Sequence, residues 1–253
     1  SILDYREGYN TGATRSTTNL TWGNESYFTY NKSVNDVHNF GAVLGMSFQN
    51  WRYDRTGLDG MYFPSDDIRT LNAASVISNQ GVNVGSEHAM LSYFGRMTYN
   101  YMSKYMLELN MRSDGSSRFG RQKRFGYFPS ASVGWRFVDE EPIQSLGWLS
   151  DGKLRFSVGS TGNEAIGDYT SQGEFTLGTN YLDFSGAAPT VMPNASLTWE
   201  TTTQYNLGLE LGFVNNRILL TTDYYLKKTR DLLYNVPIPN TTGFEFITQN
   251  IGN

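Results

Sequence analysis

The chain of 253 residues contains no cysteine, which excludes disulfide bonds and thiolate metal ligands. Charge is also scarce, because 17% of the residues are charged, against about 25% in an ordinary soluble domain. The net charge of −4 offers no basic footprint for nucleic acid. No apolar run approaches the ~20 residues of a membrane-spanning helix. Membrane-spanning β-strands are not excluded, since each needs only about 9–11 residues of alternating apolar and polar character.

The residues that are abundant favour strands and turns. Aromatic side chains make up 15% of the chain, and there are 26 glycines, a mixture that suits β-structure better than helices. Groups for catalysis are few. The two histidines, His38 and His88, lie in unrelated segments, and neither a metalloprotease HExxH nor a hydrolase GxSxG motif is present. The sequence therefore predicts an all-β protein that is not an enzyme.

Apolar and polar residues alternate with a period of two in several segments. In 204–213, for example, one parity carries Tyr205, Leu207, Leu209, Leu211 and Phe213, and the other carries only polar residues and glycine. The same alternation recurs in 39–49, 103–112, 130–137 and 153–158. Each such strand has one face in apolar and one in polar surroundings. A soluble sandwich and a membrane barrel both satisfy this pattern.

Two further features favour the membrane barrel over the sandwich. Connections alternate between short turns and long polar segments, as barrels do with periplasmic turns and extracellular loops, and aromatic residues cluster beside the short turns, as in an interfacial girdle. The short turns are Ser33–Asp36, Tyr101–Lys104 and Val214–Asn216, and the long segments are Asn50–Met90, Ser113–Tyr127 and Asp231–Phe244. In the strands, every charge lies on the polar parity; Lys or Arg facing lipid at mid-bilayer would cost about 2–4 kcal/mol. We predict a transmembrane antiparallel β-barrel.

The pattern predicts about ten or eleven strands in the chain, within the range that barrels show. A hairpin is expected about Gly23-Asn24, between strands 15–22 and 25–31. Residues 160–203 hold either one long loop or an even number of strands, and alternation near 172–178 favours a strand pair. Glu140-Glu141-Pro142 predicts a short helix start, with the acids solvated or capping it.

A specific string occupies residues 105–135. It reads YMLELNMRSDGSSRFG over 105–120 and FGYFPSASVGW over 125–135. Three more strings follow in order: LRFSVGSTGN with IGDY from residue 154, PNASLTWET from residue 193, and NR, DYY, T and DLL between 216 and 233. Together they resemble the SusC/RagA family of TonB-dependent outer-membrane transporters of Bacteroidota. The match covers about residues 90–253, and residues 1–90 share only barrel character.

The resemblance implies that residues 1–253 are part of a larger barrel domain of about 22 strands, with the plug domain and final strands lying outside it. It also implies import of oligosaccharides or peptides across the outer membrane. A SusD-like surface lipoprotein would act as a lid, and the TonB–ExbB–ExbD complex would act through the plug. An ungated porin and a non-transporting surface β-protein or adhesin are the alternatives. The substrate, glycan or peptide, is left open.

The motif residues are interpreted as an ionic and hydrogen-bonded latch at the base of a loop, with Phe119, Phe125 and Phe128 packed around it. A second set of loop aromatics is a candidate for stacking on sugars or packing on the lid. No cofactor is expected, and Asp66-Asp67 lack the spaced oxygen ligands of a Ca²⁺ site. The latch set is Arg112, Asp114, Gly115, Ser117, Arg118, Phe119, Gly120, Pro129, Gly162 and Asn163; the aromatic set is Trp51, Tyr53, Tyr62, Phe63, Tyr181 and Phe184.

Overall fold

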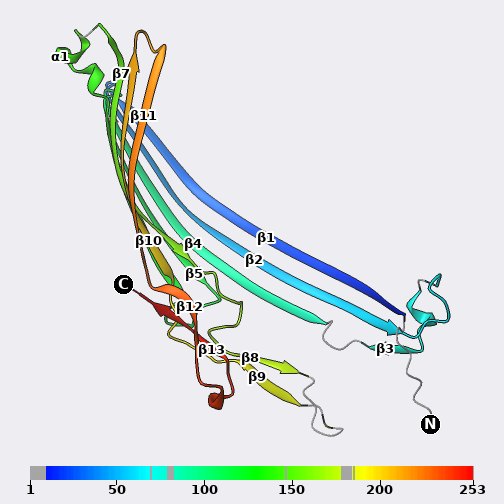
Figure 1. The fold of residues 1–253 in the computed structure, drawn as a ribbon. Coiled ribbons are helices and arrows are strands. Elements are labelled where there is room, and N and C mark those ends of the chain that lie inside the picture. Colours follow the sequence, from blue (N-terminus) through cyan, green and yellow to red (C-terminus); the bar gives the residue numbers. More distant parts are fainter. Residues whose placement is uncertain are drawn as a thin grey trace, which may run out of the picture. The chain divides into compact units, whose positions relative to one another are not determined.

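The computed structural model describes residues 10–68, 70–78, 83–145, 147–177, 184 and 186–252. Its main element is an antiparallel sheet (Figure 1). In spatial order the strands are β1 (Thr11–Val34), β2 (His38–Met61), β4 (Val84–Tyr101), β5 (Tyr105–Ser116), β6 (Phe125–Trp135), β7 (Leu149–Asn163), β10 (Glu200–Phe213) and β11 (Ile218–Arg230), with β3 (Val76–Ser78) paired to β2. Strands that are neighbours in the chain are thus neighbours in the sheet, as in an up-and-down barrel wall.

Shorter elements lie in the connections. Strands β8 (Glu174–Leu177) and β9 (Ala187–Val191) form one hairpin, and β12 (Leu232–Pro237) and β13 (Phe246–Ile251) form another. The helical pieces are η1 (Leu71–Ala73), η2 (Phe137–Asp139), α1 (Glu141–Gln144) and η3 (Asn240–Thr242). The strand pair expected within 160–203 is therefore confirmed, and so is the short helix with Pro142 in its first turn.

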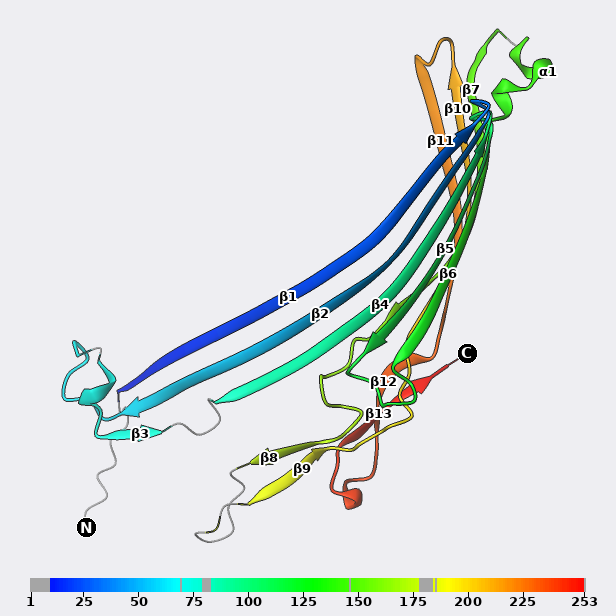
Figure 2. The same ribbon diagram turned by 180° about the vertical axis from the view of Figure 1, so that it is seen from behind.

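The chain divides into two compact units. The larger unit comprises Gly23–Gln49, Ala89–Phe175 and Pro189–Asn253, and the smaller unit comprises Ser1–Trp22, Asn50–His88 and Thr176–Ala188. Within the larger unit, the short turns and α1 lie at one end of the strands, and β12 and β13 lie at the other (Figures 1 and 2). The first end is called the turn end below, and the second the loop end.

The three predicted short turns are confirmed, and each uses left-handed backbone. Asn35 and Asp36 have φ of 54° and 55°, and Met102 and Ser103 have 55° and 57°. Positive φ at both central residues gives a hairpin the twist of its flanking strands. The third turn runs Val214–Asn216, with φ between 53° and 59°. Val214 is notable there, because β-branched residues rarely adopt positive φ.

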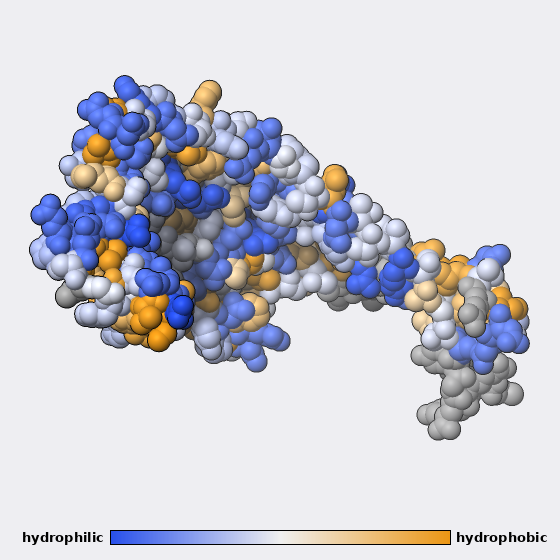
Figure 3. All heavy atoms as spheres, turned by 90° about the horizontal axis from the view of Figure 1, so that it is seen from above, coloured by the Kyte–Doolittle hydropathy of each residue, from blue (hydrophilic) through white to orange (hydrophobic). Residues whose placement is uncertain are grey.

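One face of the sheet is apolar and stays uncovered. Its side chains include Leu44 at 68% exposure and Met97 at 64%, and Leu207 at 47% continues the row on β10. Figure 3 shows hydrophobic residues (orange) at the surface beside hydrophilic ones (blue). In the described residues, the buried hydrophobic side chains are Phe119, Phe128, Val138, Leu197 and Trp199. A sandwich would bury the apolar face against a second sheet, so this face is a lipid-facing one.

The hairpin predicted about Gly23-Asn24 is wrong. Strand β1 continues without interruption from Thr11 to Val34. A two-residue turn of this type needs positive φ at both positions, and neither Gly23 nor Asn24 adopts it. Gly23 lies instead flat against β2, where a Cβ would approach Gln49 Cγ and Phe48 O to 3.2 Å. The long partner strand β2 supplies the hydrogen bonds that a hairpin would have replaced.

The predicted long polar loops are shorter than expected. Strand β2 extends to Met61 and β4 begins at Val84, so most of 50–90 is paired strand. Strands β5 and β6 likewise extend into 113–127, and β12 occupies much of 231–244. Where a strand extends beyond the bilayer, water contacts both of its faces. Its sequence there no longer alternates between apolar and polar residues, although the hydrogen-bonded ladder continues. The sequence pattern therefore marked only the membrane-embedded part of each strand.

Candidate functional site

A small aromatic core lies at the loop end of the larger unit. Leu197 is 0% exposed and Phe119 is 1% exposed, and both pack with Phe128 and Trp199. The Trp199 ring centroid lies 5.2 Å from that of Phe119 and 5.4 Å from that of Phe128, the latter edge-on. The indole nitrogen of Trp199 donates to the carbonyl of Arg124 at 2.8 Å. The core thus joins the loop after β5 to the segment before β10.

Three glycines of the motif strings allow this close packing. A Cβ on Gly162 would lie 2.1 Å from Phe128 Cζ, and one on Gly126 would lie 2.5 Å from the same atom. A Cβ on Gly120 would lie 2.6 Å from the carbonyl oxygen of Ala195. Contacts this short are not tolerated, so glycine is required by packing. The fourth motif glycine, Gly115, lies against the ring of Phe125. Phe125 is 44% exposed and is not part of the aromatic core.

The motif arginines form separate ion pairs, Arg112 with Asp114 and Arg118 with Asp168 and Glu164. Arg112 Nε lies 2.7 Å from an Asp114 carboxylate oxygen, and Arg112 Nη2 donates to Ser92 Oγ at 3.0 Å. Arg118 Nε lies 2.9 Å from Asp168, fifty residues away in the chain. Asp114 is only 8% exposed, so its charge depends on Arg112 for compensation. The Arg112–Ser92 hydrogen bond ties β5 to β4, and the Arg118–Asp168 pair ties two loops together.

The remaining motif residues lie at hydrogen-bonded positions in the same region. Ser117 Oγ accepts from the amide of Ala89 at 2.9 Å, and the Ser117 amide donates back to the Ala89 carbonyl at 3.0 Å. Asn163 Nδ2 donates to Glu200 at 3.2 Å. Pro129 lies opposite Met111 in the β5–β6 ladder. Arg112, Ser117, Arg118 and Asn163 therefore each contact a neighbouring strand or loop, whereas Pro129 lies within the β5–β6 ladder.

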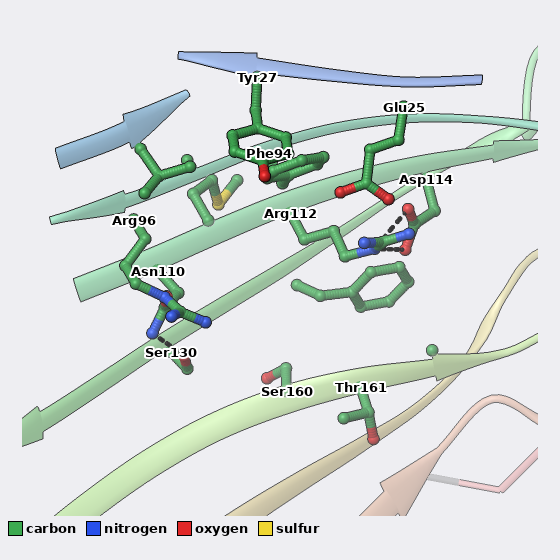
Figure 4. A pocket seen from close by; sticks show the side chains of 15 residues that line it. Glu25, Tyr27, Phe94, Arg96, Asn110, Arg112, Asp114, Ser130, Ser160 and Thr161 are labelled. Atoms are coloured by element: carbon green, nitrogen blue, oxygen red, sulfur yellow. Dashed lines mark hydrogen bonds and ion pairs between the residues drawn. The ribbon is translucent and has the colours of Figure 1, made fainter. Parts of the chain in front are cut away.

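A pocket of about 760 Å³ opens on the polar face of the larger unit. Figure 4 shows Tyr27 and Phe94 side by side above it, with Arg112 directed at Asp114 and Arg96 beside Asn110. Arg96 Nε donates to Asn110 at 2.9 Å. Gly45 makes room for both side chains, since a Cβ there would lie 2.5 Å from Phe94 Cζ and 2.8 Å from Tyr27 Cβ. Aromatic faces beside guanidinium and amide groups suit a polar organic ligand.

Another polar cluster lies at the turn end. Glu140 accepts from Tyr105 at 2.6 Å, from Lys104 at 2.9 Å and from Trp135 at 3.1 Å. These hydrogen bonds, with that of Tyr105 the largest contribution, lower the pKa of Glu140 to about 2. The bond to Glu140 raises the pKa of Lys104. Glu140 occupies the N-cap position of α1 but makes no side-chain cap hydrogen bond, and its carboxylate instead binds the beginning of β5 and the end of β6.

The predicted loop aromatics are dispersed. Trp51 and Tyr53 lie in strand β2, which corrects their expected loop position, and the Trp51 ring stacks on His88 with centroids 4.6 Å apart. Phe63 lies against Gly12, within 2.9 Å of the Cβ that a larger residue would carry. Tyr62 is 45% exposed and Phe184 is 75% exposed. Tyr181 lies outside the described residues.

Within the described ranges, no three His, Cys, Asp or Glu residues gather as metal ligands would. Asp66 of the suggested Ca²⁺ pair accepts a hydrogen bond from Asn10 at 3.0 Å. None of the helices in the described part has the length and apolar character to cross a membrane.

The whole chain matches one protein family. The description of that family is "TonB dependent receptor-like, beta-barrel", and the match runs over residues 1–253. The chain belongs to this family. Its two-faced sheet is therefore a part of a receptor barrel wall in the outer membrane, with the apolar face toward lipid and the polar face toward the lumen.

Relatives agree with this assignment. The chain is 40% identical over 243 residues to TonB-dependent receptor P39 of Formosa agariphila, covering 96% of this chain and 23% of that protein. It is 34% identical over 258 residues to TonB-dependent receptor SusC of Bacteroides thetaiotaomicron, covering 97% of this chain and 25% of SusC. A solved structure of the RagAB peptide transporter superposes with a TM-score of 0.86 at 30% identity, covering 95% of this chain and 27% of that one.

The chain thus spans about a quarter of the length of these relatives. The resemblance to SusC and RagA expected from the motif strings is confirmed, and so are the barrel fold and the outer-membrane location.

Sequence reasoning missed the lumen-face pocket of the receptor barrel. Tyr27 and Phe94 are large aromatic residues on the polar parity of β1 and β4, where neighbours such as Arg96 are hydrophilic. An aromatic side chain on the wrong parity is a signal in itself, because the lumen offers it no lipid to face. A search for such exceptions would have found both residues.

Proposed function

We propose that this chain forms part of the wall of an energised outer-membrane importer for oligosaccharides or peptides. The observation that supports this most directly is the lumen-face pocket, in which Tyr27, Phe94 and Arg96 line a cavity of about 760 Å³ within a receptor-type barrel. Aromatic, guanidinium and amide groups together bind large polar solutes by stacking and hydrogen bonding. The TonB–ExbB–ExbD complex would supply energy through a plug domain.

A surface lipoprotein of the SusD type is the partner that we propose for the loop end. The similarity to SusC and to the RagAB peptide transporter supports this partnership. Trp51, Tyr53 and Phe184 remain the proposed contacts for this lid or for substrate. Replacing Trp51 and Tyr53 by Ala in the full-length protein should reduce uptake or lid association. Unchanged uptake together with unchanged association would reject these two residues as contacts.

The transport function is tested by deleting the gene for the full-length protein and measuring growth on individual large glycans and on peptides as sole nutrient. Loss of growth on at least one of them, restored by complementation, is expected. Uptake should also stop when the proton gradient is collapsed. Growth that is unchanged on every such nutrient would reject the importer. Uptake that persists without the gradient would indicate an ungated porin.

A further inference from the structure

Three tyrosines lie at one level on the lipid-facing side of the larger unit. Tyr93 of β4, Tyr127 of β6 and Tyr205 of β10 are all exposed. Each lies eight residues along its strand from an aromatic residue at the turn end; these residues are Tyr101, Trp135 and Phe213. Eight residues span about 27 Å of antiparallel strand, or about 21 Å across the membrane at a tilt of about 40°. The two sets match the aromatic girdles on either side of an apolar band about 25 Å tall. The first set is called the tyrosine row below.

Strand β11 carries two basic residues just beyond the tyrosine row. Leu226 lies opposite Tyr205, and Lys228, two residues farther toward the loop end, lies opposite Thr203. Arg230 follows on the same parity, so these three side chains of β11 are on the face that lipid covers. Lys228 and Arg230 are exposed. Their charges therefore lie at the level of the lipid head groups, immediately outside the apolar band.

The charge of these two residues is uncompensated. Over residues 89–101 and in β5, β6, β7, β10 and β11, all of which the structure describes, they are the charged residues of the lipid-facing parity. Neither forms an ion pair with a described residue. On the lumen-facing parity, in contrast, Arg155 pairs with Glu210 and with Asp223, both at 2.9 Å. Strand β11 thus departs from the rule that charges lie on the polar parity, and it does so only beyond the tyrosine row.

The spacing of the two cations suits one phosphate group. Alternate residues of a strand are about 7 Å apart on one face, and like charges at this separation repel each other. A phosphate group between Lys228 and Arg230 would replace this repulsion by attraction to both. Arginine can bind two phosphate oxygens in parallel, and lysine supplies a point charge.

Hydroxyl groups of β10 and β7 lie beside the two cations. Thr203 lies opposite Lys228, and its Oγ1 is 3.0 Å from Ser160 Oγ. One hydroxyl proton is sufficient for that bond, so the pair keeps a second proton to donate. Thr201 lies opposite Arg230 in the same way. Cations and hydroxyl donors on one face are the groups that bind phosphate oxygens.

We propose that Lys228 and Arg230 bind the phosphate group of an anionic lipid in the outer leaflet of the membrane. The acyl chains of such a lipid extend from the phosphate along Leu226 and Tyr205, where the apolar band begins. A free phosphate ion lacks this apolar contact, and in a zwitterionic head group the lipid's own cation compensates the phosphate. Each basic residue near a membrane surface adds to the attraction for anionic lipid. The site therefore selects among membrane lipids, a role separate from nutrient import.

Lipid binding to the full-length protein in a neutral detergent tests the proposal. The probes are phosphatidylglycerol and phosphatidylcholine, each labelled on an acyl chain, and the fluorescence anisotropy of the label gives Kd. Phosphatidylglycerol should bind about twenty-five-fold more tightly than phosphatidylcholine, about fivefold for each basic residue. The preference should decrease as the salt concentration rises. Inorganic phosphate at an equal concentration should not displace the lipid.

Variants of β11 separate the lipid-facing charges from their neighbour on the lumen side. Lys228→Gln and Arg230→Gln should each weaken the Kd for phosphatidylglycerol by about fivefold. Lys228→Arg retains the charge and should keep Kd within about twofold. Lys227→Gln is the matched control, because Lys227 lies opposite Gln204 on the lumen-facing parity. Its Kd should also stay within about twofold of wild type.

Heat-modifiable migration on gels, equal to wild type, establishes that each variant is folded. Equal affinity for phosphatidylglycerol and phosphatidylcholine would overturn the proposal, and so would equal weakening by Lys227→Gln and Lys228→Gln. Displacement of the lipid by inorganic phosphate would assign the two cations to a free phosphate ion and would overturn the lipid site as well. The import function is tested separately, by growth after gene deletion.

Discussion

At the scale of single residues, glycine decides how the loop-end core packs. The ring of Phe128 occupies the volume that side chains on Gly126 and Gly162 would need. The core is small, so each contact represents a large share of it: the cluster consists of four buried side chains with three partly buried neighbours. Glycine at these positions is thus a packing residue, and it brings sequence-distant segments within contact.

Gly162→Ala should lower the thermal stability of the folded barrel. The added Cβ would overlap Phe128 Cζ, 2.1 Å away, and overpacking of this kind costs about 1–3 kcal/mol. The temperature of the heat-modifiable gel shift measures the effect. Gly147→Ala is the matched control, because nothing lies within 4 Å of its Cβ position. Equal shifts for the two variants would contradict the packing role.

Arg112→Ala should loosen the end of β5. It leaves the carboxylate of Asp114, only 8% exposed, without its cation. Because Arg112 itself is half-exposed, we expect a loss of about 1–3 kcal/mol, the cost of an unsatisfied buried polar group. Protease cleavage within 113–127 of the full-length protein should also accelerate. Arg121→Ala removes an exposed arginine of the same loop and should change neither measurement.

At the scale of elements, hydrogen bonds to Glu140 join β5 and β6 at their turn end. Glu140 follows η2 and binds side chains from the turn before β5 and from the end of β6. Its low pKa shows that the folded state prefers the ionised form. The stability that Glu140 contributes is therefore present above its unfolded pKa of 4.5 and is lost as pH falls toward about 2.

Glu140→Gln should therefore destabilise the barrel at neutral pH and become indistinguishable from wild type near pH 2. The thermal midpoint measured between pH 7 and pH 2 follows this convergence. Glu141→Gln tests the adjacent exposed carboxylate and should match wild type throughout. A Glu140→Gln deficit that stays constant across this range would show that the charge plays no part.

At the scale of the whole molecule, stability depends on the bilayer. The apolar face exposes Leu44, Met97 and Leu207 over neighbouring strands, and no layer within the described residues covers them. Lipid must take the place of a core, because leaving this much apolar surface in water is unfavourable. The opposite face of the same strands carries the polar side chains that line the lumen.

Thr222→Arg should impair folding into lipid vesicles, whereas Thr221→Arg should not. Thr222 lies opposite Leu209 on the apolar face, and Thr221 lies opposite Glu210 on the polar face. An arginine facing the bilayer interior costs about 2–4 kcal/mol, and one facing the lumen costs within about 0.5 kcal/mol. The folded fraction of the full-length protein on gels measures both. Equal impairment would mean that the faces are assigned wrongly.

Prediction from sequence succeeded where the signal is local. The period of two identified the faces of β5 and β10, because alternate side chains point to opposite sides of a strand. Turn residues such as Asn35 and Asp36 marked the short connections, since they tolerate positive φ. Gly23-Asn24 carried the same turn signal and was misread, because the partner strand β2 passes beside both residues and holds them extended.

The sequence by itself determined the barrel class, the two faces, the short turns and the family, all of which depend on residues near one another in the chain. Only the tertiary structure decided which distant groups meet. Arg118 meets Asp168, Trp199 meets the carbonyl of Arg124, and Asn250 meets Thr198. The alternation of apolar and polar residues shows which face of a strand a side chain occupies. It does not show the register of the strand or the partner of the side chain, because both depend on how the strands pair in the whole sheet. The loop-end core follows from that pairing.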